Sequence, residues 1–452
     1  MADDAAAGAT AALQQALTLY KSGDLTKAEQ AARSAVIASP NSAEAWNLLG
    51  VILRTANRPQ ESLPCYRRAL QGSPKHPAAW TNLGNAYKDI GRTEMAISCH
   101  RRAIAVQPDS GELHHNLGIA LMAARRYEDA VAAYSRALLL NPKLDDVRWD
   151  RSLALLGAGR WAEGWLDYGA RIGGPGLPLR DLPGSEWRGE INRRATLLVA
   201  SEQGIGDAIW CWRYLPMVRA RVGRLVLECR RELVELARAQ GFADEVIAYG
   251  DPLPKADAHI FQCSIPGYFT TTVPEIPPAP YLTVPSGRTA KLAPLIAAGE
   301  GLRIGIVWSG SPTFKANAER SAPLWRFIEC FGLAGVTLFS LQFGPRRQEL
   351  ETPREVPVID LTPHLDSFAD TAAAVAELDL IVMTDSAVAH LCGALGRPVW
   401  VLLPFNAYWL WGHAETTPWY PSVRLFRQRA RSDWPGVFDA AGAAMVERLA
   451  TP

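Results

Sequence analysis

The sequence is poor in cysteine and has no closely spaced cysteine pair. Its seven cysteines are scattered over 452 residues, and none stands in a Cys-x-x-Cys arrangement. A disulfide framework and a structural zinc site both require cysteines at short, regular spacing, so we expect neither. Dispersed free thiols are typical of a reducing compartment, and the sequence therefore predicts a cytoplasmic location.

An excess of charge of one sign and a long apolar run are also missing. Lys and Arg number 47 and Asp and Glu 46, for a net charge of +1. This balance gives no overall electrostatic attraction to nucleic acid or to an anionic membrane surface, so we expect neither as a partner. No apolar run reaches the roughly 18 uninterrupted residues of a membrane span, and the acidic start lacks the pattern of a signal peptide.

Residue patterns that hold metal ions are missing as well. The only adjacent histidines, His114 and His115, would point to different sides of a helix and make a poor metal clamp. No Asp-x-Asp motif follows a predicted strand. We therefore expect no metal site.

The first third of the sequence contains a repeat of fixed length. Four prolines recur at intervals of 34 residues, at positions 40, 74, 108 and 142. Ahead of the third proline stand Trp80, Leu83, Gly84 and Tyr87, in the spacing of the tetratricopeptide repeat (TPR), a pair of helices. An atypical last copy would have Val147–Gly157 as its first helix and Trp161–Tyr168 in place of its second, and the tryptophans of that second part would cap the array or dock it on the next domain. We predict a TPR α-solenoid over residues 1–170.

A TPR array usually binds an extended peptide or a partner helix, so we expect a protein partner. Asn82 and Asn116 hold equivalent places in successive repeats, directly before a Leu-Gly pair. An asparagine side chain both donates and accepts hydrogen bonds, so this pair would clamp the backbone of a bound peptide. Leu48 occupies the same place one repeat earlier, and solvated helix asparagines are the alternative interpretation.

Beyond the array the periodicity changes. Residues 171–192 include a stretch rich in glycine and proline and are predicted to be a linker. Short apolar runs then alternate with helical segments, the pattern of parallel sheets covered by helices. A proline-rich stretch at 271–285 divides them into two doubly wound, Rossmann-like domains, 193–290 and 291–452. The predicted strands are Ala195–Ala200, Leu225–Cys229, Val246–Tyr249 and Ala258–Cys263, and then Leu302–Trp308, Thr337–Leu341, Val358–Leu361, Asp379–Met383, Val399–Leu403 and Ser422–Phe426.

Two loops at the ends of predicted strands have the composition of phosphate-binding loops. Gly204, Gly206 and Asp207 follow the first strand, although Ile209 takes the place of the third glycine in GxGxxG. Asp385 and Ser386 stand where a later strand gives way to a helix, and the unpaired N–H groups at a helix start favour an anion. His390 in that helix would add a donor to the same ligand. The alternative for this loop is an Asp N-cap and a buried core histidine.

The stretches Gly204–Pro216 (GIGDAIWCWRYLP) and Thr384–Pro404 (TDSAVAHLCGALGRPVWVLLP) resemble the ADP-heptose:lipopolysaccharide heptosyltransferase family. The whole arrangement, with the array and the run Thr417–Pro421 (TPWYP), more closely resembles bacterial TPR-glycosyltransferase proteins, some of which modify flagellin in the cytoplasm. The resemblance implies the GT-B architecture, inverting glycosyl transfer, a nucleotide-sugar donor, and no metal or cofactor. It covers nearly the whole chain.

The resemblance also implies roles for particular residues. Asp207 would be the general base that takes the proton of the acceptor hydroxyl, with a helix N-cap as its alternative role. Ala387 stands where the family has glycine, which puts the choice of donor in doubt. Arg320 would bind phosphate, or else form a surface ion pair. The donor-binding residues implied are Gly204, Gly206, Ser309, Gly310, Arg320, Gln342, Asp385, Ser386, Ala387 and His390.

The sequence therefore predicts a cytoplasmic TPR-glycosyltransferase that moves a sugar from a nucleotide-sugar to a protein hydroxyl, with flagellin as the leading acceptor by analogy. The alternatives are transfer to a lipid-linked or polysaccharide acceptor, and a non-catalytic TPR scaffold.

Overall fold

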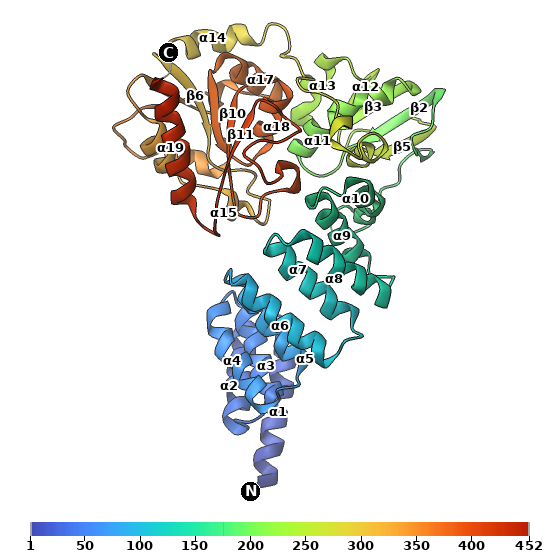
Figure 1. Ribbon diagram of the computed structural model, residues 1–452, viewed down its shortest axis with the longest axis vertical. Coiled ribbons are helices and arrows are strands. Elements are labelled where there is room, and N and C mark those ends of the chain that lie inside the picture. The colour runs from blue at the N-terminus through green and yellow to red at the C-terminus, as the bar shows by residue number, and fades with distance from the viewer. Residues whose placement is uncertain (1, 175, 451–452) are drawn as a thin grey trace. The chain divides into compact units, whose positions relative to one another are not determined.

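The computed structural model describes residues 2–174 and 176–450, and the chain divides into two compact units. The first unit ends at Gly159 and the second begins at Arg160 (Figure 1).

The first unit is an array of helices that pack in antiparallel pairs. Each predicted repeat supplies two helices, as the 34-residue period requires. The helices of the described part are α1 (Ala2–Lys21), α2 (Leu25–Ala38), α3 (Ala43–Thr55), α4 (Pro59–Gly72), α5 (Pro77–Asp89), α6 (Thr93–Val106), α7 (Gly111–Ala123), α8 (Tyr127–Leu140) and α9 (Asp145–Gly157).

A glycine in the first helix of three repeats lets a ring of the second helix pack directly on the backbone. A Cβ atom added to Gly50 would lie 2.5 Å from the Tyr66 ring, and one added to Gly118 would lie 2.3 Å from Tyr134. At Gly84 the neighbouring ring is His100, at 2.8 Å. The helix crossing in each of these repeats therefore requires glycine.

At one further position of the repeat the same hydrogen bond recurs, although the residue type that makes it changes. Trp46 and Trp80 donate their indole N–H to the carbonyl oxygens of Pro40 and Pro74, at 2.8 and 2.9 Å. In the next two repeats the same bond, to the repeat-ending proline, comes from different side chains, His114 at 3.0 Å and Arg148 at 3.1 Å. The bond ties the start of each repeat to the end of the one before it.

The second unit contains two sheets whose strands are all parallel. The first has the order β1-β5-β2-β3-β4 and the second β11-β10-β9-β6-β7-β8. The strands of the first sheet are β1 (Ser185–Glu186), β2 (Asn192–Ala200), β3 (Val222–Cys229), β4 (Glu245–Ala248) and β5 (Ala258–Phe261). Those of the second are β6 (Leu302–Val307), β7 (Val336–Ser340), β8 (Val358–Asp360), β9 (Leu380–Thr384), β10 (Val399–Leu403) and β11 (Val423–Arg427). All ten predicted strands are present, and β1 was not predicted.

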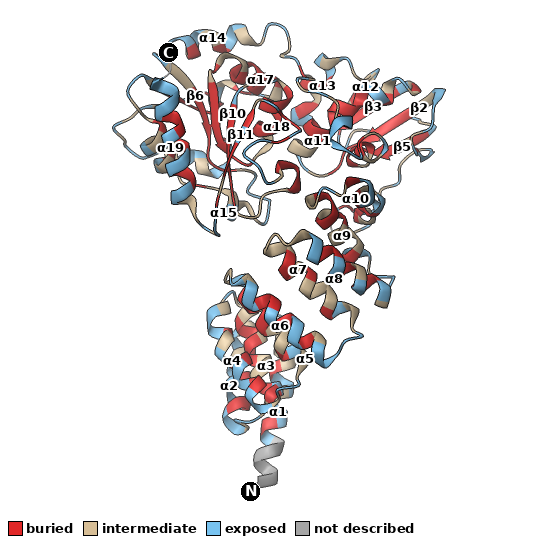
Figure 2. Cartoon of the chain, viewed as in Figure 1, coloured by how far each residue is buried: buried red, intermediate tan, exposed pale blue. Residues whose placement is uncertain are grey.

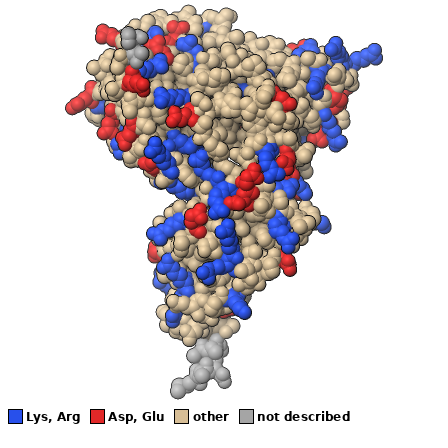
Figure 3. Space-filling model, in the orientation of Figure 1, with Lys and Arg blue, Asp and Glu red and all other residues tan. Residues whose placement is uncertain are grey.

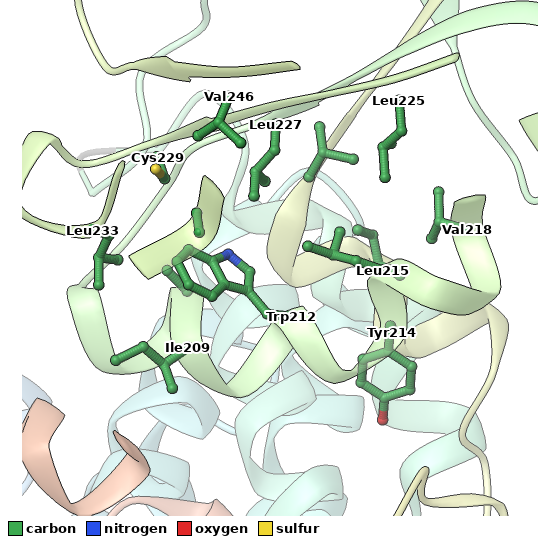
Figure 4. Close-up of a cluster of buried hydrophobic side chains, with 14 of the residues drawn as sticks. Ile209, Trp212, Tyr214, Leu215, Val218, Leu225, Leu227, Cys229, Leu233 and Val246 are labelled. Carbon is green, nitrogen blue, oxygen red and sulfur yellow. The ribbon is translucent and has the colours of Figure 1, made fainter. Parts of the chain in front are cut away.

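Each sheet is covered by helices, and its central strands are buried (Figure 2). In the first sheet Trp212 and Leu215 pack on Leu225 and Leu227 of β3 (Figure 4). The principal helices are α10 (Trp161–Tyr168), α11 (Ile205–Cys211), α12 (Leu215–Arg219), α13 (Val234–Gln240), α14 (Thr289–Ala297), α15 (Asn317–Arg320), α16 (Leu324–Phe331), α17 (Phe368–Glu377), α18 (Ala387–Ala394) and α19 (Trp434–Ala450). Helices and parallel strands in this arrangement confirm the predicted combination of an α array with an α/β region.

The predicted linker over residues 171–192 differs from the structure. Arg171, Leu177 and Trp187 are buried, and Ser185–Glu186 pairs with β5. Arg180 donates to both carboxylate oxygens of the buried Glu228, each at 2.8 Å. Glycine and proline here shape a packed segment. The division between the units falls at Gly159, earlier than the predicted end of the array at residue 170, because α10 packs within the second unit.

Candidate functional site

Asp207 lies in the first turn of α11, just beyond the carboxyl end of β2. This is the point in the first sheet where β3 lies on one side of β2 and β5 on the other, the usual place for a ligand in an open parallel sheet. The N-cap of α11 is Gly204, and Asp207, expected as the N-cap in the alternative interpretation, is instead the third helical residue. Its Oδ2 accepts a bond from the Gly204 N–H at 3.1 Å. Gln203 turns the chain with φ of 54°, in the left-handed region.

The environment of Asp207 favours a neutral carboxyl more than water does. Burial raises its pKa to about 6, the Gly204 N–H opposes the rise, and the carboxylates of Glu202 and Asp385 add to it. The residue as a whole is nonetheless only partly buried. A carboxylate that gains a proton near neutral pH, and that can be reached, has the properties of a general base.

The second loop lies beyond the carboxyl end of β9, at the corresponding switch point of the second sheet. There β6 and β9 are neighbours, while the strands that follow each of them extend in opposite directions. Ser386 is the N-cap of α18, and its buried Oγ has no hydrogen-bond partner. Asp385 accepts a bond from the Trp411 indole N–H at 3.0 Å, and burial raises its pKa. An unpaired hydroxyl at a helix start is a suitable place for an anionic group.

The two loops lie against each other. A Cβ atom added to Gly206 would lie 2.7 Å from Cδ2 of His390 and 3.4 Å from the Ala387 backbone. Gly206 is therefore required by the close approach of α11 and α18. The structure thus brings together the predicted residues of the first loop, Gly204, Gly206 and Asp207, with those of the second, Asp385, Ser386, Ala387 and His390.

His390 is held in a fixed orientation among aromatic residues. Its ring lies 4.9 Å from that of Trp411, nearly parallel, and its Nδ1 is 3.1 Å from the Tyr420 hydroxyl. Burial, and then the charges of Arg213 and Arg320, lower the pKa of His390 to about 3, so the imidazole is neutral at pH 7.

The Tyr420 hydroxyl also lies 3.4 Å from that of Tyr281, which donates to the Ile209 carbonyl of α11 at 3.0 Å. These tyrosines and Trp411 were not predicted as site residues. The Trp-Tyr-Pro run at 419–421 was the only signal for Tyr420, and it served there solely as a sign of resemblance.

The remaining predicted donor-binding residues lie at the ends of β6 and β7. Gln342 Oε1 accepts bonds from the backbone N–H groups of Trp308 and Ser309, at 2.9 and 2.8 Å, and its Nε2 donates to the Ser309 carbonyl. Gln342 thus fixes the loop after β6. Ser309 Oγ is 2.9 Å from Ser321 Oγ.

Arg320 lies over Gly310, where an added Cβ would be 2.5 Å from its guanidinium. Its Nε donates to Asn317 at 3.2 Å, and its guanidinium stacks on Phe314. The charge of Arg320 lowers the pKa values of both Asp385 and His390, although burial is the larger influence on each. Arg320 therefore supplies positive charge to the loop that follows β9.

The two asparagines predicted for acceptor binding have different partners. The Asn82 amide donates to the side-chain oxygen of Asn47 at 3.0 Å, across neighbouring repeats. The Asn116 amide donates to the Glu112 carbonyl within its own helix, at 2.9 Å. Each asparagine keeps its side-chain oxygen outside these bonds, and the clamp stays a prediction.

Comparisons with known proteins characterise the first unit. Residues 13–77, 77–110 and 111–144 each match a tetratricopeptide repeat family model. The N-terminal helices are therefore TPRs, as the 34-residue period predicts.

A curated relative, Protein FlbA of Caulobacter vibrioides, is 28% identical over 323 residues. The match covers 64% of this chain, more than the first unit contains, so the similarity extends into the second unit. It spans about half of the relative, 53% of its length.

Among solved structures, MamA is 22% identical to this chain; the match covers 34% of this chain and 90% of MamA, with a TM-score of 0.32. YrrB, described as a TPR protein with an unusual peptide-binding site, is 14% identical, and the match covers 36% of this chain and 83% of YrrB, with a TM-score of 0.32. At these TM-scores we draw nothing from the likeness.

Two further findings concern the described residues alone. Within residues 2–174 and 176–450, no helix combines the length and apolar character of a membrane span. The same residues contain no group of three or more His, Cys, Asp or Glu side chains arranged to hold a metal ion.

Proposed function

We propose that the second unit is an inverting glycosyltransferase of the GT-B type that moves a sugar from a nucleotide-sugar donor to a hydroxyl. One observation carries the proposal. The Asp207 loop of one parallel sheet lies against the helix start of α18 in the other, at the contact between Gly206 and His390. Two doubly wound, Rossmann-like halves that face each other at their switch points would bind acceptor and donor on opposite sides of the reacting carbon.

Asp207 would take the proton from the acceptor hydroxyl as that oxygen attacks the anomeric carbon. Its raised pKa, about 6, supports this role, because a base whose pKa lies near the operating pH transfers protons most effectively. The glycosidic bond to the nucleotide breaks in the same step, and negative charge develops on the leaving diphosphate.

The loop after β9 would stabilise that charge. The backbone N–H groups at the start of α18, the unpartnered Ser386 hydroxyl and the charge of Arg320 support this assignment. We assign metal-independent transfer to these groups. His390 is neutral, so it would act as a hydrogen-bonding group and not as a charge.

The TPR array would bind the protein acceptor and raise its concentration near Asp207. We propose that this acceptor is a protein in the cytoplasm, with flagellin as the first to test. The mixture of Lys and Arg with Asp and Glu on the face in Figure 3 agrees with the balanced composition, so we expect no general attraction to polyanions.

The test is transfer by the full-length protein. Purified protein is incubated with a panel of UDP-, GDP- and ADP-sugars and with flagellin, and intact-mass spectrometry detects any added sugar. Asp207→Asn should abolish the mass shift, and Asp181→Asn, an exposed aspartate, should leave it unchanged. Modification of a lipid-linked or polysaccharide acceptor instead would support the alternative substrate. No turnover and no hydrolysis of any donor would favour a non-catalytic scaffold.

A further inference from the structure

Helix α10, which directly follows the array in the chain, packs on loops of both sheets. The Trp165 ring is stacked 6.4 Å from Trp210 of α11, and it meets Trp409 edge-on at 5.8 Å. The Trp165 indole N–H donates to the Thr270 carbonyl at 2.8 Å, and Trp161 lies 5.1 Å from Trp419. The aromatic side of α10 is therefore bound to the helix that begins at the Asp207 loop and to the segment that follows β10.

The last residue of α10 and the 3-10 turn that follows it, Gly169–Arg171, contact the Asp207 loop itself. The Tyr168 hydroxyl accepts a bond from the Gln203 side chain at 3.2 Å. Arg171 donates Nε and a terminal NH₂ to the two carboxylate oxygens of Glu202, at 2.8 and 2.5 Å. A second terminal nitrogen of Arg171 donates to the Tyr168 carbonyl at 2.8 Å, so the two residues form one support.

These contacts are buried, and they meet a strained part of the chain. Tyr168, Arg171 and Glu202 have exposed fractions of 2, 6 and 5%. A buried ion pair gives little net stability, because both charges lose their water, but its fork-like geometry fixes position. Gln203 adopts a left-handed φ of 54°, which a residue with a side chain holds only when its surroundings enforce it. The Gly204 N–H that bonds Asp207 comes next in the chain.

We infer that Tyr168 and Arg171 are positioning residues for the catalytic base: through Gln203 and Glu202 they set the turn that presents Asp207. The inference rests on the proposed function. Only Ala158, Gly159 and Arg160 separate α10 from α9, the last helix of the array. The acceptor-binding array is therefore joined to the element that supports the base, and not to an unstructured linker.

The test uses the full-length protein and a pair of matched variants. Tyr168→Phe removes only the hydroxyl that bonds Gln203. Tyr214→Phe is the control, because it removes an equally buried hydroxyl bond in the same unit, to Thr270 at 2.8 Å, without touching the Asp207 loop. Arg171→Met combined with Glu202→Gln removes the ion pair without leaving a buried charge behind.

Hydrogen exchange of residues 201–207 is measured first, because it needs no substrate. Tyr168→Phe and the double variant should speed exchange in this segment by about 2- to 10-fold, the equivalent of one lost hydrogen bond, and Tyr214→Phe should not. With the nucleotide sugar that the wild type turns over, Tyr168→Phe should lower kcat by a similar factor at unchanged KM for the donor.

Equal exchange in Tyr168→Phe, Tyr214→Phe and wild type would overturn the inference, as would unchanged kcat in both test variants. If the wild type turns over no donor, the proposed glycosyltransferase activity fails, and the exchange measurement still decides whether Tyr168 and Arg171 hold the loop.

Discussion

The array and the two-sheet unit bury their side chains in different ways. In the array the important contacts join residues about one repeat apart, such as Asn82 with Asn47, which are 35 positions apart. In the second unit the contacts around the candidate site join distant parts of the chain, such as Arg213 with the Trp419 carbonyl, 206 positions apart. A substitution in the array therefore affects mainly its own repeat and the neighbouring ones. The candidate site, in contrast, forms only when several distant segments are folded together.

The largest expected effect comes from cutting the second unit at the glycine- and proline-rich segment. A fragment of residues 190–452 loses Arg171 and Arg180, which leaves the buried carboxylates of Glu202 and Glu228 unpaired, at a cost of about 3–5 kcal/mol each. We expect this fragment to aggregate and residues 160–452 to fold. Size-exclusion chromatography and thermal melts compare the two. A monomeric, cooperatively melting 190–452 fragment would show that the segment is a true linker.

The next largest effect is on catalysis. Asp207→Asn should keep donor affinity and lower transfer by roughly 10²–10⁴-fold, the range for a lost general base. Rates at saturating donor and calorimetric affinity for the same nucleotide sugar measure the two quantities. Transfer close to the wild-type rate would mean that Asp207 serves only to accept the Gly204 N–H at the start of α11, its observed local role.

How much of this the sequence could predict differs between the two regions. The helices of the array follow from a repeat whose proline recurs every 34 residues, and the parallel strands follow from short apolar runs. Asp207 and Ser386 could be found because a phosphate-binding loop is recognisable from a short stretch of sequence, in which glycine or small polar residues directly follow an apolar strand.

The partners of these loops could not be found in the same way. The bond that Gln203 donates to Tyr168 and the contact between Tyr420 and His390 join residues that are 35 and 30 positions apart, with no shared sequence pattern. The composition of the 171–192 segment suggested a linker, because glycine and proline also occur where a packed chain turns sharply.

One repeat of the array has a histidine where its neighbours have a tyrosine. His100 occupies the place of Tyr66 and Tyr134, and neither of its ring nitrogens has a partner. Burial lowers its pKa from 6.5 to about 4. The unfolded state binds a proton as pH falls through about 6.5, while the folded state does so only near 4. Stability is therefore lost across this window, by about 3 kcal/mol from this group.

His100→Tyr should remove that loss, and the reciprocal Tyr66→His should add a second one. Melting temperatures of the full chain at pH 7 and pH 4.5, taken as differences from the wild type, measure both. If the two variants show the same pH dependence as the wild type, His100 is not the group responsible.

The smallest expected effect concerns acceptor binding. Asn82→Ala with Asn116→Ala should weaken binding of the protein acceptor by about 0.5–1.5 kcal/mol for each lost hydrogen bond. Calorimetry with the acceptor protein, once the transfer assay has identified it, measures this change in affinity. Asn141→Ala, outside the predicted clamp but in the same array, is the control. Equal affinities for all variants would remove the clamp and leave the array's binding surface elsewhere.

In the bond from each repeat to the proline before it, the geometry stays the same while the chemistry of the donor side chain changes. Trp46, Trp80, His114 and Arg148 all reach the same carbonyl position, although they range from neutral and aromatic to positively charged. These side chains are also partly exposed. The bond between repeats is thus kept while the side chain that makes it varies. We therefore expect that the array can carry a new sequence of aromatic and cationic groups along its length and still keep this link between its repeats.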